Sequence, residues 1–199
     1  SGIRTRFWAE PQEECSFLAE QATRRALDQA GLVPENLDAI LVSSTSPDMI
    51  FPSTACLLQA RLGIKGIPAF DLSASCSGFL YGLSMADSFI RAGQFRRCLV
   101  VASEIKSRTL DFNDLSTAIL FGDGAGAAIV EKSSSSDVGI VSIHIHADGN
   151  YHDLVKISGG GSRQPLSQSV LESNGHTLRI RGSQLFRIAI RQLGQAVRE

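Results

Sequence analysis

The stretch that decides the fold is Ile67-Pro68-Ala69-Phe70-Asp71-Leu72-Ser73-Ala74-Ser75-Cys76-Ser77-Gly78-Phe79-Leu80-Tyr81-Gly82-Leu83. Residues 68–72 are mostly apolar and are bounded by turn-forming residues, which predicts a short buried strand. The small residues 73–75 carry the chain round a corner. A helix is then expected from about Ser77 to Ala92, ended by Gly93. Its apolar residues recur at helical spacing: Phe79, Leu80, Leu83, Ala86, Phe89 and Ile90.

Cys76 lies at the corner where this strand becomes this helix. Unpaired backbone N–H groups and the positive end of the helix dipole are expected near such a position. Both favour the thiolate, which is the nucleophilic form of cysteine. The small neighbouring residues leave room for a bulky acyl donor. The position therefore predicts a nucleophile, although free cysteines are commonly small buried hydrophobic residues, and that structural alternative stays open.

Two more apolar runs, residues 39–44 and 98–103, predict buried strands before and after this stretch. Helices are expected from Pro11 to Ala30, and from Pro52 at its first turn to Gly63. This alternation predicts right-handed crossovers and a mostly parallel sheet covered on both faces. Sites in such sheets lie at the carboxyl ends of strands, where Cys76 falls. The inward face of the first helix is expected to comprise Phe17, Leu18, Ala22, Ala26 and Leu27.

The pattern is less regular after residue 103. The expected elements are a polar loop over 104–116, a tight glycine turn over 122–126, a strand over 127–131, an exposed turn over 132–137, a strand over 139–147, a mobile loop over 158–174, a short strand over 176–180 and a helix over 182–198. The residues of this last helix that are expected to point inward are Leu185, Ile188, Ala189, Leu193 and Val197.

Composition excludes several classes of function. The 199 residues carry a net charge of −1, which does not support binding to nucleic acid or to an anionic membrane surface. No apolar run approaches the roughly 20 residues of a membrane span. The four cysteines, at 15, 56, 76 and 98, have no spacing typical of a disulfide framework or a metal site, which favours a reducing cytoplasm.

Two other motifs invite a ligand, and neither fits one. The glycines of 122–126 are followed by an apolar strand, whereas a dinucleotide fingerprint needs a helix there. His144 and His146 alternate beside Asp148 but lack a third ligand at a convincing spacing, so no metal is expected. A structural turn and a structural strand are the preferred interpretations.

Two runs together, Asp71–Phe79 and Leu120–Ala128, resemble the signatures of β-ketoacyl-[acyl-carrier-protein] synthase III, a condensing enzyme of the thiolase superfamily. Residues 51–56 and 143–149 resemble that family as well, and the likeness follows the chain in order. The combination is far more specific than any one motif.

The resemblance implies an α/β, thiolase-like layered fold. Residues 1–147 would form its N-terminal half, a mostly parallel mixed sheet flanked by helices, and residues 148–199 a connecting segment and the start of the second half. Because the chain opens at Ser1 and closes within a predicted helix, it is expected to be an internal portion of a longer enzyme chain. The family's catalytic His and Asn would follow Glu199.

The resemblance also implies an acyltransferase of the cytoplasm that initiates fatty-acid biosynthesis. It would condense an acyl-CoA primer with malonyl-[acyl-carrier-protein], with loss of CO₂, and without a cofactor beyond coenzyme A and phosphopantetheine thioesters. Cys76 would be the catalytic nucleophile, and Phe51, Phe121 and Gly182 would bind substrate. Phe51 would reach across a homodimer interface and close the partner's acyl pocket. The acyl carrier protein would be the protein partner.

One departure from the family keeps alternatives open. Many members carry an Arg that contacts the adenine of coenzyme A where this chain has Asp114-Leu115-Ser116. The primer could therefore be an unusual acyl-CoA or be delivered by a carrier protein. The alternatives are a quinolone- or polyketide-type starter enzyme, a hydroxymethylglutaryl-CoA synthase, or a non-catalytic partner subunit. The arginines at 91, 96 and 97 fit a solvated helix end, or else docking of an acidic carrier protein.

Overall fold

The computed structural model describes residues 2–135 and 138–198. The chain divides into two compact units. Residues 7–105 and 122–143 form the first, which we call the sheet unit. Residues 1–6, 106–121 and 144–199 form the second, which we call the loop-rich unit. Each unit is described by itself.

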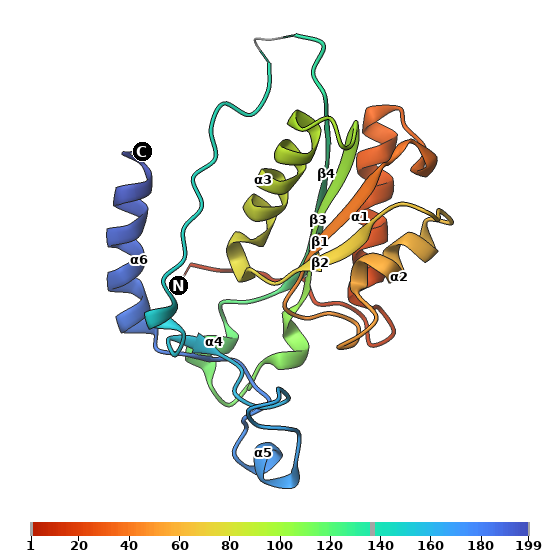
Figure 1. The fold of residues 1–199 in the computed structure, drawn as a ribbon. Helices are drawn as coiled ribbons and strands as arrows, with labels where there is room; N and C mark the ends of the chain where they lie inside the picture. The colour runs from red at the N-terminus through yellow and green to blue at the C-terminus, as the bar shows by residue number, and fades with distance from the viewer. Residues whose placement is uncertain (1, 136–137, 199) are drawn as a thin grey trace. The chain divides into compact units, whose positions relative to one another are not determined.

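The sheet unit is built on four strands in the order β2-β1-β3-β4 (Figure 1). These strands are β1 (Ala39–Ser43), β2 (Ala69–Leu72), β3 (Arg97–Ile105) and β4 (Asp123–Glu131). β1 pairs in parallel with both β2 and β3, and β4 runs antiparallel to β3. The predicted α/β class and mostly parallel sheet are confirmed. β2 is half-buried rather than buried as predicted, because it is an edge strand.

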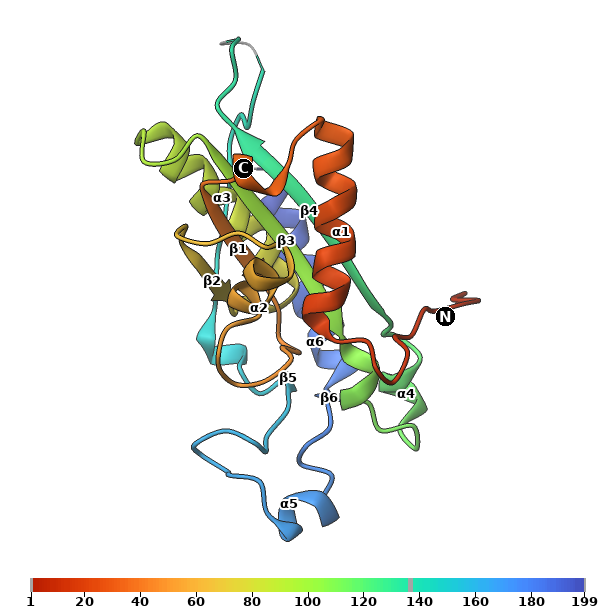
Figure 2. The same ribbon diagram turned by 90° about the vertical axis from the view of Figure 1, so that its right-hand side faces the viewer.

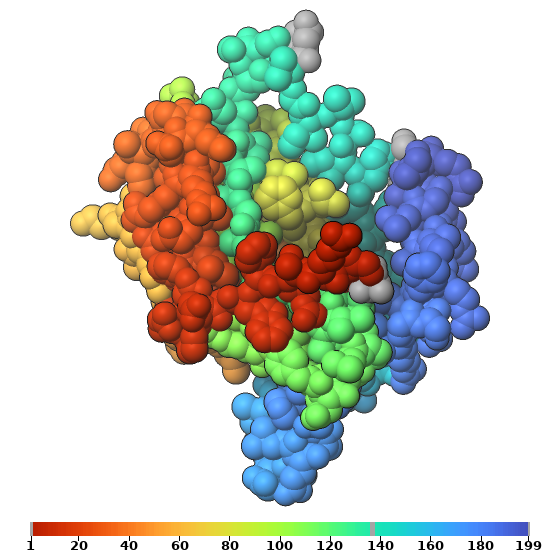
Figure 3. Space-filling view, turned by 180° about the vertical axis from the view of Figure 1, so that it is seen from behind, coloured from red at the N-terminus to blue at the C-terminus, as the bar shows by residue number. Residues whose placement is uncertain are grey.

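Helices cover both faces of this sheet (Figures 1 and 2). α1 (Cys15–Ala30) and α2 (Thr54–Arg61) pack on one face, and α3 (Gly78–Arg91) packs on the other. Figure 3 shows α1 lying alongside β4. The alternation of side chains along β1 explains the two cores, since successive residues of a strand point to opposite faces. Ile40 and Val42 pack beneath α1 and α2, whereas Ala39 and Leu41 pack beneath α3.

The helix ends follow local backbone chemistry. Gly31 and Gly93 end α1 and α3 with φ of 64° and 73°, a conformation that glycine adopts at no steric cost. α1 begins later than predicted, because residues 11–12 form a turn. α2 also begins later, at Thr54, because Ser53 is its cap and its hydroxyl accepts from Cys56 N at 3.2 Å. The buried residues of α1 also differ from the predicted face, of which only Leu27 is fully buried: Cys15, Ser16, Ala19, Thr23 and Leu27.

Two predictions for the middle of the chain are wrong. Residues 122–126 do not form a glycine turn, because β4 begins at Asp123 and runs straight through Gly124 and Gly126, which pair with Glu104 and Ala102 of β3. The antiparallel ladder along β3 holds these glycines extended. Residues 139–147 form no strand, and no described strand pairs with them. The predicted turn over 132–137 is exposed as far as Ser135, and its last two residues lie outside the described part.

The loop-rich unit has short elements. Its helices are α4 (Leu115–Ala118), α5 (Gln168–Glu172) and α6 (Gly182–Ala196), and its strands β5 (Val155–Lys156) and β6 (Arg179–Ile180) pair antiparallel. The predicted polar loop over 104–116 is wrong in part, since β3 continues to Ile105 and 3₁₀ and α-helical turns follow. The loop predicted over 158–174 contains α5. α6 exists as predicted, and none of its residues is fully buried; of the five predicted to point inward, Leu185, Ile188 and Ala189 are half-buried, whereas Leu193 and Val197 are exposed.

Candidate active site

Cys76 lies on a 3₁₀ turn, Ser75–Ser77, between the end of β2 and the start of α3. The predicted corner is confirmed, and Cys76 is exposed. Ser75 adopts a φ of 49°, in the left-handed region that residues other than glycine rarely occupy. Such strain persists where the surroundings fix the backbone, and it recurs at functional sites. The corner therefore presents the thiol outward at the carboxyl end of a parallel strand.

Small residues allow α3 to lie directly on the sheet. Gly78, Gly82 and Ala86 follow at intervals of four and are all buried. A Cβ atom at Gly78 would lie 1.8 Å from Ser43 Oγ, and one at Gly82 would lie 2.6 Å from Val100 Cγ1. The start of α3, and with it the Cys76 turn, is thus seated against the end of β1. The regular spacing of these small residues is the sequence signal for this contact. The prediction from apolar periodicity did not use it.

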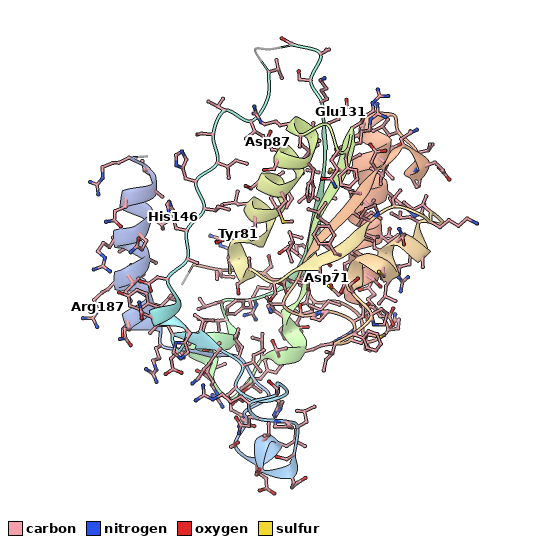
Figure 4. The ribbon with its side chains drawn as sticks, in the orientation of Figure 1. Asp71, Tyr81, Asp87, Glu131, His146 and Arg187 are labelled. Carbon is pink, nitrogen blue, oxygen red and sulfur yellow. The ribbon has the colours of Figure 1, made fainter. Side chains whose placement is uncertain are left out.

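Asp71 connects the strand before Cys76 to the helix on the other side of the sheet. Asp71, labelled in Figure 4, is the third residue of β2. It pairs in register with Val42 of β1. One carboxylate oxygen accepts from Thr54 N at 2.8 Å and the other accepts from Ala55 N at 2.8 Å. These N–H groups are free at the start of any helix, and a carboxylate is the favoured partner for them.

Phe51 lies on the loop between β1 and α2. Its side chain is 83% exposed, and the neighbouring Ile50 is 93% exposed. The base of this loop is tied to β3 through Glu104, whose carboxylate accepts from the N–H of Thr45 at 2.9 Å and from the hydroxyl of Ser46. The loop thus has an anchored base and an apolar tip.

Asp48 anchors the same loop to α1. Its carboxylate accepts from Ser16 N at 3.1 Å and from Ser16 Oγ at 2.8 Å. Arg61 of α2 donates to that hydroxyl at 2.9 Å. Asp48, Asp71 and Glu104 therefore hold the loop from three directions. All three contacts join residues distant in sequence, so periodicity and motif spacing gave no sign of them.

The other two predicted substrate-binding residues belong to the loop-rich unit. Phe121 is half-buried against a small apolar cluster that includes Leu110 and Leu178. Gly182 is the exposed first residue of α6. Their role in substrate binding stays a prediction, as does the predicted division of the chain at residue 147.

Cys15 and Cys98 are buried in the sheet unit and have the chemistry of structural thiols. Burial raises the pKa of Cys15, which also contacts Ser103 and Ser44, the former through its carbonyl at 3.3 Å. Burial, with a smaller effect of the Asp38 carboxylate, raises the pKa of Cys98 to about 11. Both thiols stay protonated at neutral pH.

Arg91 forms an ion pair with Asp87, and Arg97 forms one with Glu131; the two acidic side chains are labelled in Figure 4.

Within the described parts of the chain, no three His, Cys, Asp or Glu side chains are placed to hold a metal ion. No helix in those parts has both the length and the apolar character needed to cross a membrane.

Comparison with known proteins adds sequence and fold relatives. A family model described as 3-oxoacyl-[acyl-carrier-protein (ACP)] synthase III matches residues 70–149. The β-ketoacyl-[acyl-carrier-protein] synthase III of Methylococcus capsulatus is 47% identical over 199 residues, which are 100% of this chain and 60% of that protein. The chain therefore spans about 60% of the length of the curated relatives it matches.

Solved structures agree. The crystal structure of 3-oxoacyl-[acyl-carrier-protein] synthase III from Aquifex aeolicus VF5 has a TM-score of 0.87 and 39% identity, covering 99% of this chain and 58% of that one. The priming β-ketosynthase of the R1128 polyketide pathway has a TM-score of 0.81 and 34% identity, covering 96% of this chain and 56% of that one. The resemblance to β-ketoacyl-[acyl-carrier-protein] synthase III, and with it the thiolase-like fold class, is therefore confirmed along the whole chain.

Proposed function

We propose that the complete protein is a cytoplasmic acyltransferase that condenses an acyl thioester primer with malonyl-[acyl-carrier-protein] to give a β-ketoacyl-[acyl-carrier-protein]. The observation that carries the proposal is the exposed Cys76 on a strained turn between β2 and α3. The relatives at 43–47% identity, which are named for this reaction, support it.

The chemistry proceeds in two stages. The Cys76 thiolate attacks the acyl carbonyl of the primer, the carbonyl–sulfur bond of the primer breaks, and the departing thiolate takes up the proton that Cys76 released on ionising. The malonyl thioester then loses CO₂, and the resulting enolate carbon attacks the acyl carbonyl on Cys76. That step forms the new carbon–carbon bond and returns the thiolate. Stabilising the enolate falls to the catalytic His and Asn that the resemblance places after Glu199.

We assign stabilisation of the acyl oxyanion to the backbone N–H of Cys76. The turn consumes the N–H groups of Ser77, which donates to Ala74 O at 3.2 Å, and of Gly78, which donates to Ser75 O. An N–H fixed at the start of a helix is the kind of donor that stabilises a developing oxyanion without reorganisation.

Replacing the nucleophile tests the proposal. In the complete protein, Cys76→Ser is expected to abolish trapping of a radiolabelled acyl primer and to lower condensation by about 1,000-fold or more. Cys56→Ser is the matched control, because Cys56 is also exposed but lies on α2. Retained acylation of the Cys76→Ser protein would refute the assignment.

The predicted homodimer and carrier protein also enter here as proposals. Contiguous exposed apolar side chains at Met49, Ile50 and Phe51 support self-association, because large exposed apolar patches mark interaction sites. The outer edge of β2 is unpaired among the described strands and lies in the same unit.

Phe51→Ala is expected to extend the range of accepted primers, and an unchanged range would overturn the pocket-closing role of Phe51.

A polyketide-type starter enzyme is the second candidate. Two observations favour it: the fold likeness to the R1128 priming β-ketosynthase, and the run Asp114-Leu115-Ser116 where many members of the resembled family carry an Arg. Comparing acyl-CoA with acyl-[acyl-carrier-protein] as primers, with one malonyl donor, discriminates the two. Acylation of Cys76 from the carrier alone would favour the second candidate.

A further inference from the structure

The loop that carries Phe51 is held at both of its ends by a carboxylate of the sheet. Glu104 at the end of β3 holds Thr45 and Ser46 where the loop begins. Asp71 on β2 holds Thr54 and Ala55 where the loop becomes α2. Between these ends the tip stays exposed. The exposed tip is therefore carried by a loop whose two ends are both fixed to the sheet.

Asp71 is the anchor that also leads to the nucleophile. Its strand ends at Leu72, and Cys76 follows five residues after Asp71. Gly78 then seats the start of α3 against Ser43 of β1, the strand that pairs with β2. β1 therefore contacts the chain on both sides of Cys76: it pairs with β2 before it and packs against the start of α3 after it. Asp71 thus joins the Phe51 loop to the frame that positions Cys76.

The hydrogen bonds at α2 leave little slack in this connection. The first three N–H groups of α2 are all occupied, two by Asp71 and the third by Ser53 Oγ. Because each oxygen of Asp71 takes a different N–H, the carboxylate fixes the direction of α2 as well as its distance from β2. Bonds to a charged acceptor are also stronger than neutral ones.

We propose that Asp71 is a positioning residue for primer selectivity: it fixes the end of the Phe51 loop to the sheet, so that Phe51 is held in place for the acyl pocket that it closes. The inference rests on the proposed function, in which Phe51 closes the acyl pocket of the partner subunit. Losing Asp71 loosens the base of the loop, so that longer primers are accepted, while Cys76 remains on its own turn.

The sheet unit offers a matched control. Asp38 also accepts from two backbone N–H groups, Arg96 N at 2.8 Å and Arg97 N at 2.9 Å, but it lies before β1 and holds the start of β3. In a parallel sheet that end is opposite the carboxyl ends where Cys76 and the Phe51 loop lie. Asp38→Ala therefore removes a comparable clamp far from the candidate site.

The test measures kcat/KM for a short and a long acyl primer in the complete protein. Asp71→Ala is expected to shift the ratio of the two values toward the long primer by about tenfold, the scale set by losing hydrogen bonds to a charged group. Asp38→Ala is expected to change that ratio by less than about twofold. If Asp71→Ala does not fold, Asp71→Asn, which keeps one acceptor, is expected to give a smaller shift in the same direction.

Combining variants separates the outcomes. If Asp71 acts through Phe51, the Phe51→Ala/Asp71→Ala double variant has the primer ratio of Phe51→Ala alone. Equal ratios for Asp71→Ala and Asp38→Ala, or additive effects in the double variant, would overturn the inference while leaving the proposed function intact. Loss of acylation in Cys76→Ser tests the proposed function separately.

Discussion

α3 and α6 are helices of similar length and similar amphipathic pattern, and they differ in how they are packed. α3 has 14 residues, and it buries Gly78, Gly82 and Ala86 against the sheet. α6 has 15 residues and buries none, and its Phe186, Ile190 and Leu193 are 66%, 57% and 67% exposed. Periodicity predicts both helices. The close spacing of small residues distinguishes the helix that packs directly on a sheet.

The largest test of this comparison is Gly78→Ala. The new methyl group would lie 1.8 Å from Ser43 Oγ and 2.9 Å from Ser43 Cβ, so α3 has to move away from β1. We expect a loss of about 2–3 kcal/mol in the free energy of unfolding, since overpacking a dense core costs that much. Cys76 acylation is expected to fall with it, because the nucleophile lies two residues from the displaced position. Urea unfolding and acyl trapping measure the two effects.

Rescue makes that prediction specific. Ser43→Gly removes both clashing atoms and leaves Ala74 Cβ, at 3.9 Å, as the nearest of the three neighbours. The Gly78→Ala/Ser43→Gly double variant should therefore recover acylation relative to Gly78→Ala. A double variant as inactive as Gly78→Ala would show that glycine is needed at 78 for a reason other than contact with Ser43.

A matched pair of phenylalanines gives a smaller effect. Phe89 of α3 packs on the core, and its ring meets that of Phe95 edge to face, with centroids 5.4 Å apart. Phe89→Ala is expected to cost about 2 kcal/mol, below the roughly 3–5 kcal/mol of a fully buried aromatic, because the side chain is only half-buried. In the 199-residue chain, Phe186→Ala on α6 is expected to change stability by less than about 0.5 kcal/mol. Equal costs for the two would erase the distinction between the helices.

The sheet unit was predictable because its signals are local. Apolar runs placed β1 and β3, and Gly31 and Gly93 marked two helix ends that the structure confirms. The glycines of residues 122–126 predicted a turn. That prediction is wrong because pairing with β3 holds these residues extended. The inward face predicted for α6 holds at Leu185, Ile188 and Ala189, which are half-buried, but not at Leu193 and Val197, because periodicity does not say how far along a helix its packing partner extends.

The candidate site divides in the same way. Cys76 was identified from its position at a strand-to-helix corner, which is a local property. Asp71, Glu104 and Ser43 were missed, since their contacts reach residues 16, 59 and 35 positions away, for example Ala55 from Asp71, Thr45 from Glu104 and Gly78 from Ser43. Only the folded sheet brings such groups together.

The smallest test concerns Cys98, which lies in the core beneath α3. Its pKa is raised to about 11 from the ordinary value of 9.0, mainly by burial. An unfolded chain releases this proton from about pH 9, whereas the folded chain holds it until about pH 11. Stability is therefore full below pH 9 and is lost as the pH rises toward 11, by on the order of 2 kcal/mol.

Cys98→Ala is expected to flatten this alkaline decline, although it costs about 1 kcal/mol at neutral pH for the lost sulfur. Cys15, whose pKa is also raised by burial, leaves part of the decline in place. Val101→Ala is the control, because it removes apolar volume from the same strand without a titrating group. Urea midpoints measured from pH 7 to 11 test this prediction. If stability declined as steeply in Cys98→Ala as in the unaltered protein, the core beneath α3 would be open to water. The contrast between α3 and α6 would then lose its physical basis.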